Sequence, residues 1–195
     1  MSTGPNSKTA SFLLAAYVFL SVVTVPPARS QKVNDVVDGD LQATLQKEYP
    51  GAKIVGANDV NAQSCYYPPG TVPRTHPGWV KADFNGDGRA DHAVLFMVGL
   101  PEKQPQGALV KVHLAVFLRE KSGSYQKIML FSFEHYYPVS GLIQKQPPGM
   151  IKEPLGDKTV KLTSPGIQIV SCEQYAKVFY WDKKANKFAE VQTVD

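Results

Sequence analysis

The segment from Val80 to Leu95 reads V-K-A-D-F-N-G-D-G-R-A-D-H-A-V-L and has a polar centre between two apolar runs. The flanking residues, 78–82 and 92–98, are rich in β-branched and aromatic side chains, which favours strands on both sides. The centre, Asp83 to Asp91, contains acidic and amide side chains interspersed with glycines. The sequence therefore predicts a strand–loop–strand unit over residues 78–98.

The centre of this unit has the pattern of a calcium-binding loop. Oxygen-bearing side chains stand at loop positions 1, 3, 5 and 9, and a glycine at position 6 permits a sharp bend. A hard cation such as Ca²⁺ binds several oxygens and offsets the repulsion between nearby carboxylates. The predicted ligands are the side chains of Asp83, Asn85, Asp87 and Asp91 and the backbone carbonyl of Arg89. The alternative is an ordinary turn in which these side chains accept hydrogen bonds from backbone N–H groups.

Two known kinds of calcium loop differ in what surrounds them. An EF-hand requires an entering helix and a glutamate at position 12, where this chain has Val94. Residues 80–95 instead resemble the calcium loop of the FG-GAP/VCBS repeat family. That resemblance implies the five ligands named above, with Asp91 in the bidentate role. Only one copy is present, so a propeller of repeats is not expected. Small exported bacterial proteins with one such segment inside an α+β domain are more similar.

The N-terminus has the features of a secretory signal peptide. Lys8 precedes a nearly unbroken apolar run from Ala10 to Val25, and Ala28-Arg29-Ser30 offers small residues for cleavage before Gln31. The run has about sixteen residues, whereas a membrane span needs about twenty. We therefore expect residues 1–30 to be removed and the protein to be secreted or periplasmic, without a stable membrane span; an uncleaved anchor is the alternative.

Composition and charge argue against nucleic-acid binding. The formal net charge is +4, and two of the positive charges, Lys8 and Arg29, belong to the predicted leader. The other lysines and arginines are scattered, with no basic run and no RNA-binding aromatic motif. The sequence does not decide the oligomeric state.

The two cysteines, Cys65 and Cys172, are predicted to form a disulfide. An even, isolated pair in an exported protein favours a bridge, and its spacing fits neither a metal motif nor a redox motif. Because the bridge would close a loop of roughly 100 residues, loop entropy alone would stabilise the fold by about 4 to 5 kcal/mol. The alternative is two separate buried thiols.

Residues 31–195 are expected to form a single domain with one helix near its N-terminus. Asp40 is the predicted N-cap of a helix over residues 41–49. Leu41, Leu45 and Tyr49 recur every four residues, which gives the helix one apolar face.

The remaining chain is predicted to be rich in strands. In residues 108–119, Val110 and its alternating neighbours form one face, and Lys111, His113 and Arg119 form the other. Residues 136–154, rich in proline and glycine, are predicted to be an irregular loop. Strands are expected at 53–56, 78–82, 92–98, 108–119, 125–133, 159–162, 166–171, 175–181 and 187–193. The predicted class is α+β, mainly an antiparallel meander of about seven to nine strands with one N-terminal helix.

Catalytic motifs are few. The four histidines form no HExxH pattern, and no nucleophile elbow or P-loop is present. We therefore favour a non-catalytic calcium-binding domain whose proline-rich loops, one of them containing Tyr66 and Tyr67, bind a protein or glycan partner. The alternative is a secreted hydrolase whose carboxylates meet only in three dimensions. Its candidate carboxylates are Glu102, Glu120, Glu134, Asp157 and Glu173.

Overall fold

The protein is described here from a computed structural model that covers residues 37–61, 76–103, 105–154, 156, 158–171 and 175–194. The predicted leader (1–30), Tyr66, Tyr67, Cys65 and Cys172 lie outside these residues. Residues 36–195 form one compact unit. Within the described residues, no helix is long and apolar enough to span a membrane.

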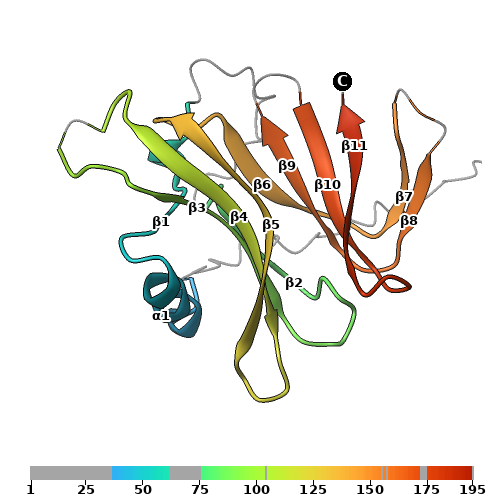
Figure 1. Ribbon diagram of the computed structural model, residues 1–195. Coiled ribbons are helices and arrows are strands. Elements are labelled where there is room, and N and C mark those ends of the chain that lie inside the picture. Colours follow the sequence, from blue (N-terminus) through green and yellow to red (C-terminus); the bar gives the residue numbers. More distant parts are fainter. Residues whose placement is uncertain are drawn as a thin grey trace, which may run out of the picture. The chain divides into compact units, whose positions relative to one another are not determined.

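One helix and eleven strands make up the described part of the chain (Figure 1). In chain order they are α1 (Gly39–Glu48), β1 (Lys53–Ile54), a short 3-10 turn (Ala57–Asp59), β2 (Trp79–Ala82), β3 (Asp91–Val98), β4 (Leu109–Arg119), β5 (Tyr125–Tyr136), β6 (Gly141–Gln146), β7 (Gly149–Lys152), β8 (Thr159–Leu162), β9 (Gly166–Ser171), β10 (Tyr175–Asp182) and β11 (Lys187–Val194).

The strands form three antiparallel sheets. The first has the order β1-β3-β4-β5, and β2 also pairs with β3, beyond the end of β1. The second has the order β11-β10-β9-β6, and β7 pairs with β8 in a separate two-stranded sheet. The predicted α+β class, mainly antiparallel with one N-terminal helix, is therefore confirmed.

The irregular loop predicted for residues 136–154 is wrong. This segment contains β6, which pairs with β9, and β7, which pairs with β8. Pro147 and Pro148 lie between these two strands, where no pairing N–H group is needed. The prolines thus mark the connection between two strands and not the whole segment.

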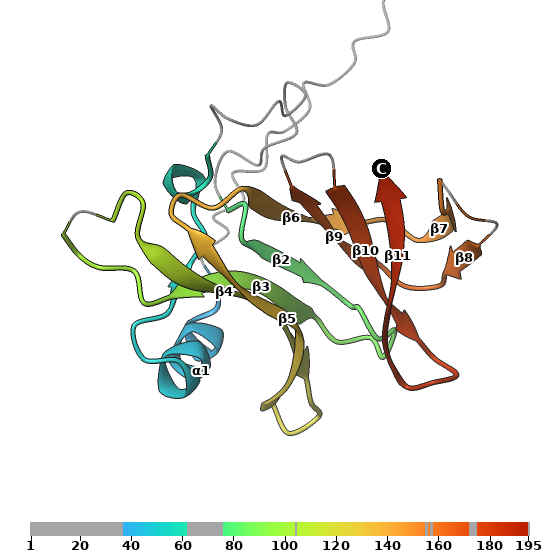
Figure 2. The same cartoon turned by 45° about the horizontal axis from the view of Figure 1, so that its top comes forward.

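The helix begins slightly earlier than the sequence predicts. Asp38, not Asp40, is the N-cap, and its carboxylate accepts the N–H of Asp40 at 3.1 Å. Leu41 and Leu45 are buried, as the four-residue spacing predicts, and they pack against the first sheet with Trp79. Figures 1 and 2 both show α1 on the side of this sheet that faces away from the second sheet.

Both faces of the first sheet are buried. One face of β3 and β4, including Leu95 and Leu114, packs with Ile169 and Phe179 of the second sheet in the main core. The opposite face packs under α1 and includes Phe96. The sheet is thus the middle layer between a helix and a second sheet.

The polar face predicted for β4 is correspondingly wrong at His113. This side chain is buried, and its ring stacks on Phe96 at 5.0 Å and lies 5.4 Å from Tyr49. Lys111 remains exposed on the same face, near the end of the strand. The helix therefore covers the middle of a surface that periodicity alone assigns to solvent.

The alternation of faces along β5 is interrupted by a bulge. Pairing moves from Leu114–Phe131 to Ala115–Met129, so that Leu130 has no opposite partner. Leu130 and Phe131 both pack against the main core, although neighbouring residues of a regular strand point to opposite faces.

Gly78 lies where three segments of backbone converge. A Cβ atom added there would stand 2.6 Å from the Val55 carbonyl oxygen and 2.7 Å from the Leu95 carbonyl oxygen. We expect Gly78→Ala to lower the free energy of unfolding by about 1 to 3 kcal/mol, because backbone must move to admit the methyl group. Urea denaturation measures this. Gly39→Ala is the control, since its Cβ meets nothing within 4 Å, and an equal loss in both variants would contradict the argument.

His92 makes the stability of the fold depend on pH. Burial, followed by the Lys81 charge, lowers the pKa of His92 from 6.5 to about 4. Its Nδ1 accepts the Trp79 indole N–H at 3.1 Å. The unfolded chain binds this proton more readily, so stability is full above pH 6.5 and falls as the pH drops towards 4, by about 3 kcal/mol.

Thermal melts between pH 7 and pH 4 measure this loss. We expect His92→Asn, which keeps an acceptor for Trp79, to be less stable at pH 7 and to lose less stability on acidification. The same pH dependence in both proteins would show that another group causes it.

Candidate metal centre

The predicted ligand loop joins two neighbouring strands. β2 and β3 pair antiparallel, with Ala82 opposite Asp91, so residues 83–90 form the connection between them. Gly86 and Gly88 have φ values of 74° and 86°, a region that other residues rarely adopt. Strands flank the loop on both sides, as the sequence predicts, and the EF-hand arrangement of two helices is absent here.

Asp83 is the centre around which the loop is wound. Its Oδ1 accepts the N–H groups of Gly86 at 2.7 Å and Asp87 at 3.0 Å, and its Oδ2 accepts that of Gly88 at 2.8 Å. Three backbone dipoles therefore point at one carboxylate, which pulls residues 86–88 into a tight coil.

Asn85 and Asp87 lie next to each other on the exposed side of the loop. The Asn85 amide donates to Asp87 Oδ2 at 2.8 Å, and Asn85 Oδ1 accepts the Asp87 N–H at 3.1 Å. The Arg89 guanidinium also pairs with Asp87. Burial alone would raise the pKa of Asp87, but the Arg89 backbone N–H and the Asn85 amide outweigh it and hold that pKa below its usual value.

Asp91 occupies the opposite, buried side of the loop. Its Oδ2 accepts the Phe84 N–H at 2.9 Å, and its Oδ1 accepts the Arg119 N–H at 2.8 Å. Burial raises the pKa of this carboxyl, and the nearby Asp87 charge adds to the rise, although the backbone N–H groups of Arg119, Phe84 and Asn85 oppose it. Asp91 thus ties the loop to the end of β4.

A second buried carboxylate shows how the fold compensates such a charge elsewhere. Asp59, 2% exposed, accepts the Lys53 ammonium at 2.6 Å, the Gly56 N–H at 2.9 Å and the Tyr137 hydroxyl at 3.0 Å. Asp91, 0% exposed, forms no ion pair with any cationic side chain of the described residues. Its negative charge is the less compensated of the two.

Phe84 anchors the loop in the main core. Its ring is fully buried, and its carbonyl accepts the Ser164 hydroxyl at 2.7 Å from the connection between β8 and β9. The sequence reasoning did not identify this anchor. The sequence does contain one indication of it, because Phe84 is the only large apolar residue between Asp83 and Asp91.

The donor set suits a hard cation, because all five predicted ligands supply oxygen. The loop brings Asp83, Asn85 and Asp87 into one network of hydrogen bonds. Its carboxylates are turned towards N–H donors, and no three acidic, histidine or cysteine side chains converge as a metal-holding group within the described residues. A bound cation would have to replace some of these N–H groups as the partner of the carboxylate oxygens.

Comparisons with known proteins add no further identification: no family model matches the chain, and neither the curated proteins nor the solved structures include a significant match.

The bridging role of Asp91 predicts a large effect of a small change. Asp91→Asn replaces one acceptor with an N–H₂ group facing a backbone donor, so we expect a loss of about 1 to 3 kcal/mol in unfolding free energy. Asp87→Asn, on the exposed side, should change stability by less than about 0.5 kcal/mol. Urea denaturation in chelator compares the two, and equal effects would argue against the buried bridge.

Proposed function

We propose that Asp83–Asp91 binds one calcium ion and that this ion stabilises an exported, non-catalytic domain. The observation that carries the proposal is the buried carboxylate of Asp91, which has backbone donors but no cationic partner among the described residues. A cation bound at the loop would compensate this charge. The resemblance of residues 80–95 to FG-GAP/VCBS loops supports the same assignment.

Each ligand has a distinct task in this proposal. Asp83 and Asn85 supply exposed oxygens from the start of the loop, and Asp91 supplies oxygens from its buried base. Asp87 adds the third negative charge once calcium displaces the Arg89 guanidinium, while the Arg89 carbonyl remains available as a ligand. Ca²⁺ accepts irregular sets of six to eight oxygens, whereas Mg²⁺ demands near-octahedral geometry, so calcium is the better match.

The expected benefit is mechanical. Asp91 accepts N–H groups from both the loop and the end of β4, and the Phe84 side chain is buried in the main core between the two sheets. An ion that fixed the loop would therefore stabilise the junction of β2, β3 and β4. Export and the binding of a protein or glycan partner complete the proposal, and both rest on the sequence.

The hydrolase alternative receives less support from the positions of its carboxylates. Glu120 lies in the hairpin that begins β5, and Glu134 lies near the far end of the same strand. At about 3.4 Å per residue they stand roughly 30 Å apart, whereas a catalytic pair lies within about 10 Å. These two cannot act together on one bond. Glu102 lies in the connection between β3 and β4, and Asp157 and Glu173 lie outside the described residues.

Thermal melts of the leaderless protein test calcium binding. With a Kd of about 10⁻⁴ to 10⁻³ M, 10 mM calcium should add about 1.4 to 2.7 kcal/mol to the unfolding free energy. We expect Tm to rise with calcium, to change little with equal magnesium, and to return to its starting value in chelator. In Asp87→Asn the calcium response should disappear.

Arg89→Ala is the control that separates calcium binding from a general loss of structure. It removes the guanidinium that competes for Asp87 and keeps the backbone carbonyl. The variant should therefore be less stable in chelator, because the Arg89 bond to the Arg119 carbonyl is lost, and should gain more from calcium than the unaltered protein. A Tm that does not respond to calcium in either protein would refute the proposal.

A further inference from the structure

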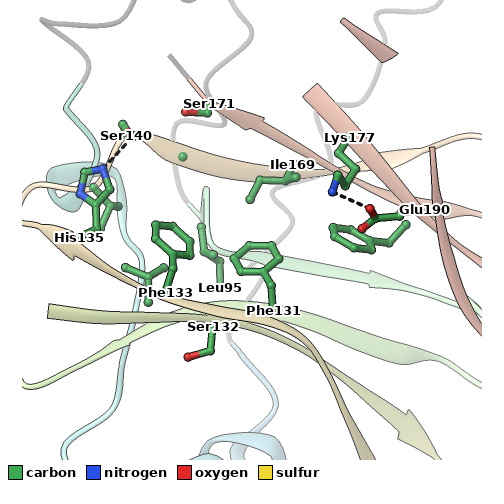
Figure 3. A pocket seen from close by; sticks show the side chains of 14 residues that line it. Leu95, Phe131, Ser132, Phe133, His135, Ser140, Ile169, Ser171, Lys177 and Glu190 are labelled. Atoms are coloured by element: carbon green, nitrogen blue, oxygen red, sulfur yellow. Dashed lines mark hydrogen bonds and ion pairs between the residues drawn. The ribbon is translucent and has the colours of Figure 1, made fainter. Parts of the chain in front are cut away.

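A cavity of about 440 Å³ lies between the two large sheets, away from the metal loop. One side is formed by β3, β4 and β5, and the other by residues of β6, β9, β10 and β11. Figure 3 shows Phe131 and Phe133 pointing into it from β5, while Ser132 points away. The volume is within the range of about 300 to 1,000 Å³ in which small-molecule sites fall.

The walls of the cavity are apolar. Phe131 lies 6.0 Å from Phe179 across the gap between the sheets and 5.5 Å from Phe133 along its own strand. Leu95 and Ile169 complete the walls. Phe133 is 44% exposed even though it is a large apolar residue, so part of the wall is open to solvent. Burying this surface under an apolar ligand would be favourable.

One end of the cavity has a fixed polar pair. His135 Nδ1 lies 2.6 Å from the Tyr136 carbonyl, and His135 Nε2 lies 3.1 Å from the Ser140 hydroxyl. Because a carbonyl only accepts, Nδ1 carries a proton, and this bond fixes the orientation of the ring. The neutral Nε2 then accepts the Ser140 hydroxyl proton, so the Ser140 oxygen is the atom of this pair that can accept a proton from a ligand hydroxyl.

The opposite end has charges that cancel each other. Lys177 and Glu190 pair at 2.7 Å on neighbouring strands, and both line the cavity (Figure 3). A charged ligand would be attracted by one member of this ion pair and repelled by the other. It would also lose its hydration on entering the cavity. An uncharged ligand avoids both costs.

We propose that this cavity binds a small uncharged amphipathic molecule. Its apolar ring or chain lies between Phe131, Phe133 and Ile169, and its hydroxyl group donates to the Ser140 oxygen, whose own proton bonds to His135. The cavity is lined by none of the residues of the calcium loop, so either proposal can fail alone.

A fluorescence titration with Nile red, an uncharged apolar dye, tests the site in the leaderless protein. We expect saturable binding with a blue shift, at one dye per chain. Decanol should displace the dye, and decanoate, which has the same chain but a negative charge, should require at least tenfold higher concentration. Equal displacement by both would overturn the charge argument, and no saturable binding would overturn the site.

Gly141 offers a variant that closes the cavity without removing any contact. It lines the cavity, and a Cβ there would meet the Val170 carbonyl at 3.7 Å and Ile169 Cδ1 at 4.0 Å, which are ordinary contacts. The backbone there thus admits a Cβ atom. We expect the larger side chain of Gly141→Leu to fill part of the cavity and to weaken dye binding at least tenfold, and a thermal melt checks that the variant folds. Phe133→Ser, at a partly exposed position, should also weaken it.

Met150→Ser is the matched control, because Met150 is 66% exposed and does not line the cavity. This variant should bind the dye as the unaltered protein does. Dye binding that fell with Met150→Ser and persisted in Gly141→Leu would indicate a general apolar surface and overturn the proposal. A stoichiometry of one dye per two chains, with a dimer in size-exclusion chromatography, would assign the cleft to a second copy instead.

Discussion

The carboxylate of Asp91 is the constraint on which the β2–β3 unit depends. It accepts one N–H from the loop, at Phe84, and one from the end of β4, at Arg119. A carboxylic acid or an amide at this position would turn a donor group towards one of these two N–H groups. The carboxylate is therefore kept in its charged form, although its exposure is 0%. At Asp59 the fold offsets the same cost with a lysine, and at Asp91 the described residues provide no such partner. This contrast is the physical reason to look for a cation at the loop.

The layered arrangement follows from the composition of β3. Its residues are almost all buried, because α1 covers one face and the second sheet covers the other. The helix is short and closes only the middle of its face, so His113 is buried while Lys111 is not. On the other face the two large sheets enclose a cavity near the end of β5, where Phe133 remains partly exposed. The cavity is thus a consequence of incomplete contact between two sheets.

The sequence predicts those features of the fold that depend on a few neighbouring residues, such as the bounds of a strand. The bounds of β8 and β9 agree with the predicted strands, because turn residues and alternation both act over a few residues. The bulge at Leu130 and the burial of His113 were not predictable in this way, since each depends on what a distant segment packs against it. The strands within 136–154 were missed because prolines between strands resemble prolines within a loop.

The two candidate sites also differ in how far apart their residues lie along the chain. All five predicted ligands lie within nine residues, so the sequence alone can predict them as a group. The second hydrogen-bond donor to Asp91 comes from Arg119 on another strand, and the sequence could not predict it. The cavity is lined by residues of β3, β4, β5, β6, β9, β10 and β11, and no short motif could reveal it. The two sites nevertheless share a strand: Asp91 begins β3, and Leu95, four residues later on the same face, lines the cavity. A cation at the loop would therefore stiffen one wall of the cavity from its end, without touching any molecule bound inside.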